Sequence, residues 1–449
     1  IIQLLEAPYF NLKDFIQSCL NILQDVDIKE EMIVYSQHFR LSHLISHYIP
    51  DHDLHDRFIE ITRFTEASWK NGSRECYFFT LHNHEHARFL VFTIHDLIEK
   101  TGFQIYLNQR EAFRLFVSCF LHDMGMLSEP PETVLYSKEN TKDKAHIYDQ
   151  ILAPLSEIAA SIKNSNDIKI NSSVKKKVFI MNEFVEQLRM EIVRDKHHQI
   201  SKNEILWDYP KLPLTTAERR DVAEICNAHN IDIYEVNKLA EIVYDGRSPV
   251  NLRLLSYLLR LADLCDVSHI RVSKDVLERN EERMGKESIF HWIKHMSVER
   301  IEIVRADKDN SSTKINIYHY YLPLMYVNDR TLNEKCGDNC KKHRTIKFEE
   351  WEKPVPLIEH HLNEERSTIK YLDGNICNII CAFINKSYNW FYPEVIAINR
   401  YFKELKLDIK LDLSILRSEV EEKYDFLYVE NRNEQRSAQE FMMDYLLYD

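Results

Sequence analysis

The sequence predicts a mainly α protein in which an all-helical core is followed by a smaller α+β domain. Apolar residues recur at helical spacing in four segments, which are "HARFLVFTIHDLIEK" (86–100), "EAFRLFVSCFLHD" (111–123), "DVAEICNAH" (221–229) and "NLRLLSYLLRLADLCD" (251–266). Only seven glycines occur in the 449 residues, and none lies in a GxGxxG or GxxxxGK pattern. Rossmann and P-loop folds are therefore disfavoured, because both use such loops to hold phosphate.

The pattern changes after about residue 275. Residues 300–322 alternate apolar and polar side chains around a Ser/Asn-rich turn, which predicts a β-hairpin, and residues 405–416 alternate more strictly, which predicts a strand. The last residues, 431–449, have the pattern of an amphipathic helix that packs on its own domain or docks a partner. Because the chain exceeds the size at which a single core keeps growing, we expect three parts: an N-terminal helical segment (1–74), a helical domain (75–275) and an α+β accessory domain (276–449).

Composition and charge narrow the class of protein. The formal net charge of −13 disfavours a surface that binds nucleic acid all over, although Lys175–Lys177 and Arg219–Arg220 are either a local basic channel or ordinary solvated faces. No stretch approaches the roughly 18 apolar residues of a membrane span, and no signal-peptide pattern follows Ile1. The nine cysteines resemble buried apolar residues rather than a disulfide framework. We therefore expect a cytoplasmic protein without a membrane partner, and a start at Ile1 is what a trimmed fragment would show.

Histidine and aspartate interrupt the apolar helices at five places. Burying such groups is costly unless something pairs with them. In chain order the places are "TLHNHEHARFL" (80–90), "FLHDMGM" (120–126), "IVRDKHHQIS" (192–201), "EICNAHNID" (224–232) and "LLRLADLCD" (258–266). Each histidine alone is explained as well by an ordinary core or surface position. Together, imidazole and carboxylate suit divalent metals such as Mn, Fe, Co, Ni, Zn or Mg, and adjacent His and Asp can serve two metals that share one carboxylate.

This order of motifs resembles the HD superfamily of metal-dependent phosphohydrolases, whose pattern is H…HD…D with two further histidines in two-metal members. "TLHNHEHARFL" resembles the T-D-H-G-x-x-H opening of one subgroup, and "LHDMGM" resembles L-H-D-I-G-K/M. "VRDKHHQIS" resembles R-x-x-H-x-x-x-S and favours His197 over His198, "ICNAHN" resembles A-H-G, and "LLRLADLCD" resembles L-R-x-A-D. The resemblance covers residues 75–275 and implies an all-helical HD domain with six metal ligands: His86, His122, Asp123, His197, His229 and Asp263.

The sequence also departs from the HD pattern. Leu81 replaces an acidic residue, and Asn83 and Asn230 replace glycines. These departures leave His84 as the alternative to His86 for the first ligand.

The dipeptide His-Asp occurs four times, and only its context separates the copies. His52-Asp53 and His55-Asp56 follow a proline in a polar segment, which predicts surface residues or a helix start. His95-Asp96 is expected on the solvated face of the helix that begins near His86. Only His122-Asp123 ends an apolar helix shortly before a glycine, Gly125, which we expect to let the chain turn tightly around a metal.

The resemblance implies a reaction as well as a fold. Two divalent cations, with Mn favoured, would turn a bridging water into hydroxide and align it for in-line attack on phosphorus. Asp123, His82 and Glu85 are the predicted catalytic residues, with His82 and Glu85 orienting ligands and His82 protonating a leaving oxygen, unless both are ordinary helix-start residues. The predicted contacts to substrate phosphate are Arg194, Lys196 and Arg260, and Arg260 alternatively pairs with Asp266.

The resemblance does not single out a substrate, because HD enzymes include nucleases, nucleotide phosphohydrolases and cyclic-nucleotide phosphodiesterases. The opening motif and the appended α+β domain are similar to HD proteins found beside Hsp90-like ATPase modules in bacteria, some in antiviral settings. That similarity implies a nucleotide or nucleic-acid substrate, a nuclease or nucleotide-depleting role in defence, and an Hsp90-like ATPase partner. The alternative is a catalytically silent HD-derived module that binds nucleotide for regulation or assembly. A rival zinc site at Cys336, Cys340 and His343 has no obvious fourth ligand.

Overall fold

The structure is a computed structural model that describes the greater part of the chain outside its N-terminal residues and several internal segments. The described residues are 40–72, 80, 82–128, 192–209, 211–246, 248–267, 269–280, 284, 286–305, 312–319, 358–359, 362–363, 366–367, 370–371, 387–388, 390–417, 428–431 and 434–437. The predictions for Lys175–Lys177 and for Cys336, Cys340 and His343 lie outside them. Within these residues, no helix combines the length and the apolar character that crossing a membrane requires.

The larger part of the described chain is a helical bundle, as the sequence predicts. Its main helices are α4 (His52–Gly72), α5 (His84–Lys100), α6 (Gln109–Leu121), α10 (Thr216–Ala228) and α12 (Leu252–Leu264). Helix α6 is central, since it contacts the other four, and its residues from Glu111 to Leu121 are all buried. A helix that is covered on every side is expected to be mostly apolar, and the buried polar residues of α6, Glu111, Arg114 and Ser118, all have hydrogen-bond partners. The four helical segments predicted from apolar spacing are thereby confirmed.

Shorter elements connect these helices. They are helical residues 40–48 and 192–203, η1 (Met124–Leu127), η3 (Glu204–Asp208), α11 (Ile233–Val236), β1 (Val243–Asp245), β2 (Ser248–Val250), η4 (His269–Arg271) and α13 (Lys274–Asn280).

Side-chain caps fix where the main helices begin. Asn83 accepts hydrogen bonds from the backbone of Glu85 and His86 at the start of α5. Capping boxes begin α6, with Asn108 and Glu111, and α10, with Thr215 and Glu218. Such caps satisfy backbone N–H groups that have no partner inside the helix. The replacement of glycine by Asn83 is therefore explained locally, because asparagine is among the preferred N-cap residues.

A buried network of ion pairs joins the bundle to the β1–β2 hairpin. The side chain of Arg114 on α6 is fully buried, and its Nε donates to Asp221 of α10 at 2.9 Å. Its Nη2 donates to Asp245 of β1 at 2.8 Å. Removing one partner of such a buried pair typically costs about 3–5 kcal/mol. Arg114 therefore holds α6 and α10 in a fixed relation.

The smaller part is a mixed sheet with two helices. Its strand order is β3-β4-β9-β5-β8, and β4 pairs with β9 in parallel while the other pairs are antiparallel. The strands are β3 (Val298–Arg305), β4 (Ser312–His319), β9 (Lys410–Arg417), β5 (Ile358–Glu359) and β8 (Lys370–Tyr371). The predicted hairpin over 300–322 is confirmed by β3 and β4. Two further hairpins are β6 (Leu362–Asn363) with β7 (Arg366–Ser367) and β10 (Tyr428–Asn431) with β11 (Glu434–Ser437).

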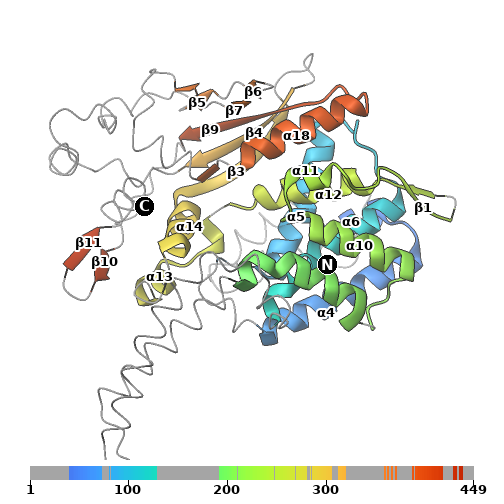
Figure 1. Ribbon diagram of the computed structural model, residues 1–449, viewed down its shortest axis with the longest axis horizontal. Helices are drawn as coiled ribbons and strands as arrows, with labels where there is room; N and C mark the ends of the chain where they lie inside the picture. Colours follow the sequence, from blue (N-terminus) through green and yellow to red (C-terminus); the bar gives the residue numbers. More distant parts are fainter. Residues whose placement is uncertain are drawn as a thin grey trace, which may run out of the picture.

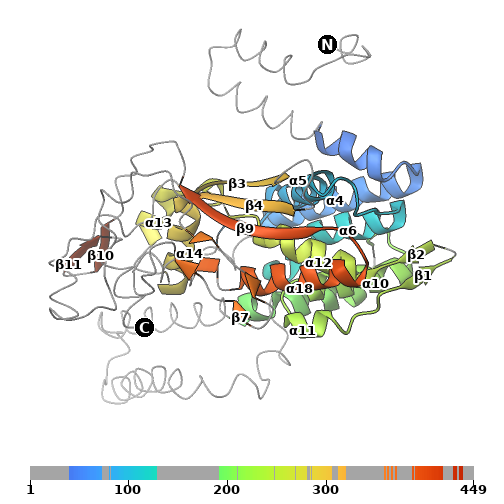
Figure 2. The same ribbon diagram turned by 90° about the horizontal axis from the view of Figure 1, so that it is seen from above.

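The two parts share one apolar core. Helix α18 (Phe391–Glu404) lies between α12 of the bundle and β9 of the sheet, and it contacts both (Figure 1). Helix α14 (Lys286–Ser297) leads directly into β3, and seen from above the sheet strands run from α14 towards the bundle (Figure 2). A single cluster of buried apolar residues extends from Leu41 to Ile415. The sheet is therefore packed onto the helical part.

Two predicted elements differ from the structure. The strand over 405–416 begins only at Lys410, because α18 continues to Glu404 and the chain then turns through Lys406, whose φ is 58°. Its predicted apolar face is nevertheless buried from Ile409 onwards. The amphipathic helix predicted for 431–449 is wrong at residues 431 and 434–437, where β10 and β11 pair. Strand pairing outweighs the helical periodicity of these residues, and the other residues of the prediction lie outside the described part.

A buried histidine at the end of β4 is expected to make stability depend on pH. His319 is fully buried between Ser297 and Tyr388, and burial, followed by the nearby Lys294 cation, lowers its pKa to about 3. Below about pH 6.5, His319 binds a proton in the unfolded chain but stays neutral in the folded chain. The free energy of unfolding therefore decreases towards pH 3, by about 1.4 kcal/mol per pH unit. Denaturant midpoints measured from pH 7.5 to 4.5 should fall less steeply for His319→Gln than for the parent. An equal slope in both, with exposed His52→Gln as the control, would contradict this assignment.

Candidate metal centre

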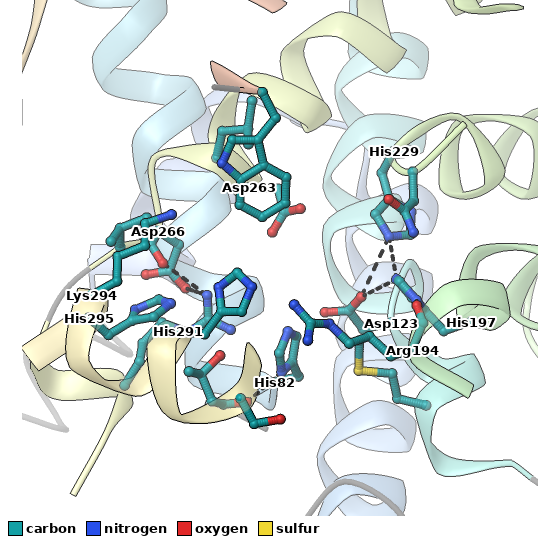
Figure 3. A pocket seen from close by; sticks show the side chains of 18 of the residues that line it. His82, Asp123, Arg194, His197, His229, Asp263, Asp266, His291, Lys294 and His295 are labelled. Carbon is teal, nitrogen blue, oxygen red and sulfur yellow. Dashed lines mark hydrogen bonds and ion pairs between the residues drawn. The ribbon is translucent and has the colours of Figure 1, made fainter. Parts of the chain in front are cut away.

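Six predicted residues meet at one site because each lies at or near the end of a helix, and Asp123, His197, His229 and Asp263 of them line a pocket. His86 is in the first turn of α5, His122 and His229 are the C-terminal caps of α6 and α10, and Asp263 is in the last turn of α12. Asp123 follows His122 directly, and His197 lies on the helical residues 192–203. Three of these helices point their C-terminal ends at the pocket, and the partial negative charge there favours a cation. The pocket has a volume of about 370 Å³ (Figure 3).

One group of side chains gathers around the Oδ2 atom of Asp123. This oxygen lies 3.1 Å from Nε2 of His122 and 3.5 Å from Nε2 of His86. The Oδ1 atom of Asp263 lies 3.3 Å from the same His86 nitrogen and 4.0 Å from that of His122. The ligand atoms of His86, His122 and Asp123 are close enough together to bind one metal ion.

A second group gathers around the other oxygen of the same carboxylate. Oδ1 of Asp123 lies 3.4 Å from Nε2 of His197 and 3.7 Å from Nε2 of His229, as the dashed lines in Figure 3 mark. These three residues also form a set that could hold a metal ion. Asp123 thus belongs to both groups, through a different oxygen in each.

Hydrogen bonds to the outer nitrogen settle which nitrogen of each ring faces the pocket. The Nδ1 atoms of His122, His197 and His229 lie 3.1, 2.5 and 2.5 Å from the backbone carbonyl oxygens of Cys119, Arg194 and Cys226, each three residues earlier. A carbonyl oxygen only accepts, so Nδ1 carries the proton and donates it. Nδ1 of His86 donates in the same way to the carboxylate of Asp266. The Nε2 atoms of His122, His197 and His229 therefore present lone pairs to the site, the form in which imidazole binds metals, and that of His86 does so once its second proton has left.

These lone pairs need a positive partner. Nε2 of His197 lies 2.7 Å from Nε2 of His229, and Nε2 of His86 lies 3.3 Å from Nε2 of His122. The Nε2 atoms of His197 and His229 are both acceptors and cannot hydrogen-bond each other, and Oδ2 of Asp123 is buried without a hydrogen-bond partner among the described residues. Buried polar atoms normally have partners, and each exception calls for an explanation. The donor set, four imidazoles and two carboxylates, fits divalent cations of the transition series.

The carboxylates of the pocket are held in the charged form that a cation requires. Burial opposes the charge on Asp123, but the neighbouring imidazoles, His122 first and then His197, hold its pKa well below the usual range. Burial and the Arg271 cation oppose protonation of His86, yet its hydrogen bonds to Asp263 and Asp266 raise its pKa to about 9. A surplus of negative charge therefore surrounds His86. Burial and the neighbouring imidazoles His197 and His122 keep the pKa of His229 well below the usual range, so His229 is neutral.

Gly125 serves this site through close packing. The chain turns tightly here through the 3₁₀ helix η1, but Gly125 does not have a left-handed φ, so the turn does not require the conformational freedom of glycine. A Cβ atom at Gly125 would lie 2.3 Å from the carbonyl oxygen of His197 and 2.7 Å from the backbone nitrogen of Ser201. Ser201 accepts a hydrogen bond from Gly125 N at 2.8 Å and donates to the carbonyl oxygen of His122 at 2.6 Å. The absence of a side chain at Gly125 lets the helix that carries His197 approach Asp123.

The other predicted catalytic residues lie at different distances from the pocket. His82 lines it, its Nδ1 lies 2.5 Å from the carbonyl oxygen of Thr80, and its ring packs against that of His86. Burial, followed by the Arg271 cation, lowers the pKa of His82 to about 3, so it is neutral near pH 7. Glu85 is half-exposed and accepts from Arg88 at 2.7 Å, outside the lining residues. Their catalytic roles stay predictions.

The structure places the three residues predicted to contact phosphate differently with respect to the pocket. Arg194 lines the pocket. Lys196 lies outside the lining and pairs with Asp195 at 3.0 Å. Arg260, also outside the lining, pairs with Glu394 of α18 and donates to the carbonyl oxygens of Ala228 and Ile231. Only Arg194 of these three is brought to the pocket, and the substrate roles of all three remain predictions.

The histidines that compete for the site lie elsewhere. His84 contacts Glu85 and lines a separate pocket bounded by α4, whereas His86 faces Asp123. His52 begins α4, as predicted for a helix start. His95 contacts the hydroxyl of Tyr48 at 3.1 Å on the far part of α5. His95, Asp96 and Glu99 form a third set of side chains close enough to hold a metal ion, but none of them is buried, whereas His122 and Asp123 are. Burial and the shared carboxylate therefore separate His122-Asp123 from the other three His-Asp pairs.

Sequence patterns missed several residues of the pocket. Asp266 is buried, holds His86 and pairs with Arg271 at 3.3 Å. Asp266 could have been predicted as a pocket residue from the sequence, because it follows Asp263 by three residues and lies on the same side of the helix end. The whole wall formed by α14 was also missed, although "HWIKH" repeats polar residues at positions one, four and five, which share a helix face. The lining residues from this side are Ser288, His291, Trp292, Lys294, His295, Trp390 and Phe391.

Replacing Asp266 by Asn is expected to weaken metal binding without removing a ligand. Asparagine keeps the volume but loses the negative charge that holds the Nδ1 proton of His86. Loss of such an outer partner typically lowers metal affinity or activity about 10- to 100-fold. Titration of the protein with Mn(II) should show this loss, while the exposed Asp275→Asn should bind like the parent. Unchanged affinity in Asp266→Asn would show that Asp266 does not position His86.

Comparison with known proteins places the chain in one family. The family described as HD-CE matches residues 75–326, more than half of the chain. No curated protein and no solved structure matches. The matched region contains all six residues of the two His/Asp groups and continues through α14, β3 and β4. With an HD-type helical domain and His/Asp groups that could hold metal ions, the chain belongs to the HD-CE family.

Proposed function

We propose that the chain is a metal-dependent phosphohydrolase that cleaves phosphodiester or nucleotide phosphate bonds. The observation that carries this proposal is Asp123, whose two oxygens face two separate sets of imidazole lone pairs. His86, His122, Asp123 and Asp263 would hold one cation, and Asp123, His197 and His229 the other. Bound there, the cations would act as Lewis acids and bring the pKa of a water molecule close to neutrality.

The chain's own residues would bind and shield the substrate. Arg194 presents a guanidinium to the pocket, and such a group suits the equatorial oxygens of a phosphoryl group. Met126, Leu264, Val267 and Phe391 form apolar parts of the lining, which exclude water from the reacting atoms. Neutral His82 presents its free Nε2 lone pair and would accept a hydrogen bond from water or substrate. Attack by water needs no protein nucleophile.

The test is metal content together with hydrolysis of bis-p-nitrophenyl phosphate in the presence of Mn(II). We expect about two equivalents of metal per chain and Mn-stimulated turnover. His86→Ala should lose at least about a thousandfold in turnover, because it removes a ligand from one group. His84→Ala is the matched control, two residues away on the same helix, and should retain turnover.

Two outcomes would contradict parts of the proposal. Loss of turnover in His84→Ala but not in His86→Ala would show that His84, and not His86, is the first ligand. A parent protein that binds metal and nucleotide but shows no turnover would favour the catalytically silent regulatory module instead. A nuclease or nucleotide-depleting role in defence and an Hsp90-like ATPase partner remain predictions from the resemblance.

A further inference from the structure

The pocket has a second wall, which carries basic side chains and faces the metal centre. In Figure 3, His291, Lys294 and His295 lie on one side, and Asp123, His197 and His229 lie on the other. The first three come from α14, outside the helices that carry the metal-binding groups. This α14 wall, completed by Trp390 just before α18, has no part in holding the cations.

Lys294 is a buried cation without an ion pair among the described residues. It lines the pocket, yet the residue is only 3% exposed. Its Nζ lies 5.1 Å from the ring centre of Tyr388 and 5.0 Å from that of Trp390. Cation–π contacts offset part of the cost of burying an ammonium group, but an unpaired buried charge remains expensive. An apolar side chain of similar length would be more stable here if Lys294 had only a packing role.

Neighbouring charges make this place attractive to an anion. Burial first, and then the cations Arg271 and Arg194, lower the pKa of Lys294 to about 7, against the opposing effect of Asp263. Arg271 is already paired with Asp266. An anion that entered the pocket would meet Lys294 on the side of α14 and Arg194 on the side of the metal centre. A phosphate group has the charge and the several acceptor oxygens to satisfy both.

Trp390 offers a flat apolar surface beside this anion site. The residue is 46% exposed, although large aromatic side chains are usually covered. Its Nε1 donates to the carbonyl oxygen of Ser387 at 3.0 Å, which fixes the ring, and His291 packs against it with ring centres 5.9 Å apart. A fixed, partly exposed indole is a suitable stacking surface for a nucleobase, and one such contact contributes about 1–3 kcal/mol.

We propose that Lys294 and Trp390 form the substrate-recognition side of the pocket, where Lys294 binds a phosphate oxygen and Trp390 stacks on the base of a nucleoside phosphate. This inference rests on the proposed function and narrows its substrate from phosphate esters in general to nucleotides. The pocket volume of about 370 Å³ lies at the small end of ligand sites, which fits one nucleotide unit. That unit comes either from a free nucleotide or from a strand of nucleic acid.

The experiment measures inhibition of the bis-p-nitrophenyl phosphate reaction of the Mn-loaded protein. The inhibitors are AMP, ATP, ribose 5-phosphate, which lacks a base, and a ten-residue DNA oligonucleotide. In the parent, AMP should inhibit at least about tenfold more strongly than ribose 5-phosphate. Trp390→Ala should abolish that difference and Trp390→Phe should restore most of it. Trp207→Ala is the matched control, because Trp207 is 76% exposed on η3, outside the lining residues, and should behave like the parent.

Lys294 is tested in the same assay. Lys294→Met keeps the length and apolar stem but removes the charge, so the inhibition constants of both AMP and ribose 5-phosphate should rise about tenfold or more, and Lys294→Arg should recover part of the loss. Stronger inhibition by AMP or ATP than by the oligonucleotide identifies a free nucleotide, and the reverse identifies nucleic acid. Unchanged constants in Lys294→Met, or an unchanged ratio of AMP to ribose 5-phosphate in Trp390→Ala, would overturn the inference.

The two proposals can fail separately. If the parent hydrolyses bis-p-nitrophenyl phosphate but these variants do not alter inhibition, the proposed roles of Lys294 and Trp390 are wrong, while the proposed phosphohydrolase activity is kept. If the parent shows no turnover, the proposed function fails. Direct binding of a fluorescent ATP analogue to the same variants then decides whether the α14 wall still recognises nucleotides, and equal binding by all of them rejects it.

Discussion

Replacing Asp123 by Asn is expected to abolish Mn-stimulated hydrolysis, with a loss of at least about a thousandfold. Asparagine has almost the same shape, but it carries no negative charge and presents an NH₂ group to one of the two imidazole sets. Because Asp123 faces both sets through different oxygens, this single change should affect both cations. Elemental analysis should therefore find less than about one metal per chain, where two-metal chemistry needs two.

A matched control lies in the same protein. Asp96 follows His95 in another His-Asp pair, is half-exposed and lies 3.8 Å from Arg40. Asp96→Asn should retain metal content and turnover. The comparison then shows that the loss in Asp123→Asn depends on where the aspartate lies and not on the substitution itself. Metal content and turnover that survive in Asp123→Asn would remove the central observation behind the proposed function.

Replacing Gly125 by Ala is expected to lower the free energy of unfolding strongly, although it adds only one methyl group. The added methyl group would lie 2.3 Å from a backbone oxygen of the helix that carries His197, and backbone cannot rotate away as a side chain can. Overpacking of this kind costs about 1–3 kcal/mol, and more where backbone must shift. Moving that helix would also break the contacts of Ser201 with Gly125 and His122. Chemical denaturation should show the destabilisation, and turnover should fall because His197 moves away from Asp123.

Gly246→Ala distinguishes this steric effect from the conformational freedom of glycine. Gly246 has a φ of 63° and no atom within 4 Å of an added Cβ, so its substitution should cost about 1 kcal/mol through backbone strain alone and leave turnover unchanged. Gly125→Ala with the stability and activity of the parent would show that the helix over 192–203 does not pack as closely as the structure indicates.

Local patterns were sufficient to predict the helices and the residues that meet at the metal centre. The bundle helices have long apolar faces, and their periodicity survives packing because the same face is buried. His122, His229 and Asp263 could be identified because each interrupts an apolar run at a helix end. His84 and His86 could not be separated by pattern, since both lie in the first turn of α5 and only the direction of the side chain distinguishes them.

Features that depend on distant partners were not predictable in this way. The α14 wall reaches the pocket because the sheet packs on the bundle, and no local pattern encodes that contact. The parallel pairing of β4 with β9 joins strands that are separated by a long stretch of chain. The close packing at Gly125 was also missed, because the backbone that excludes a side chain there comes from residues 197–201. In each case the deciding neighbour is remote in sequence.

The ion pair between Arg260 and Glu394 implies that the two parts of this protein are not separable modules. Arg260 holds the carbonyl oxygens on either side of His229, at Ala228 and Ile231, and Glu394 from α18 neutralises its buried charge. A chain cut before α18 would leave an uncompensated guanidinium next to His229, one of the residues that could hold a metal ion. A chimaera that takes its C-terminal part from a relative should therefore fold only when it keeps both the arginine of α12 and an acidic partner on α18. The two parts thus depend on each other for folding.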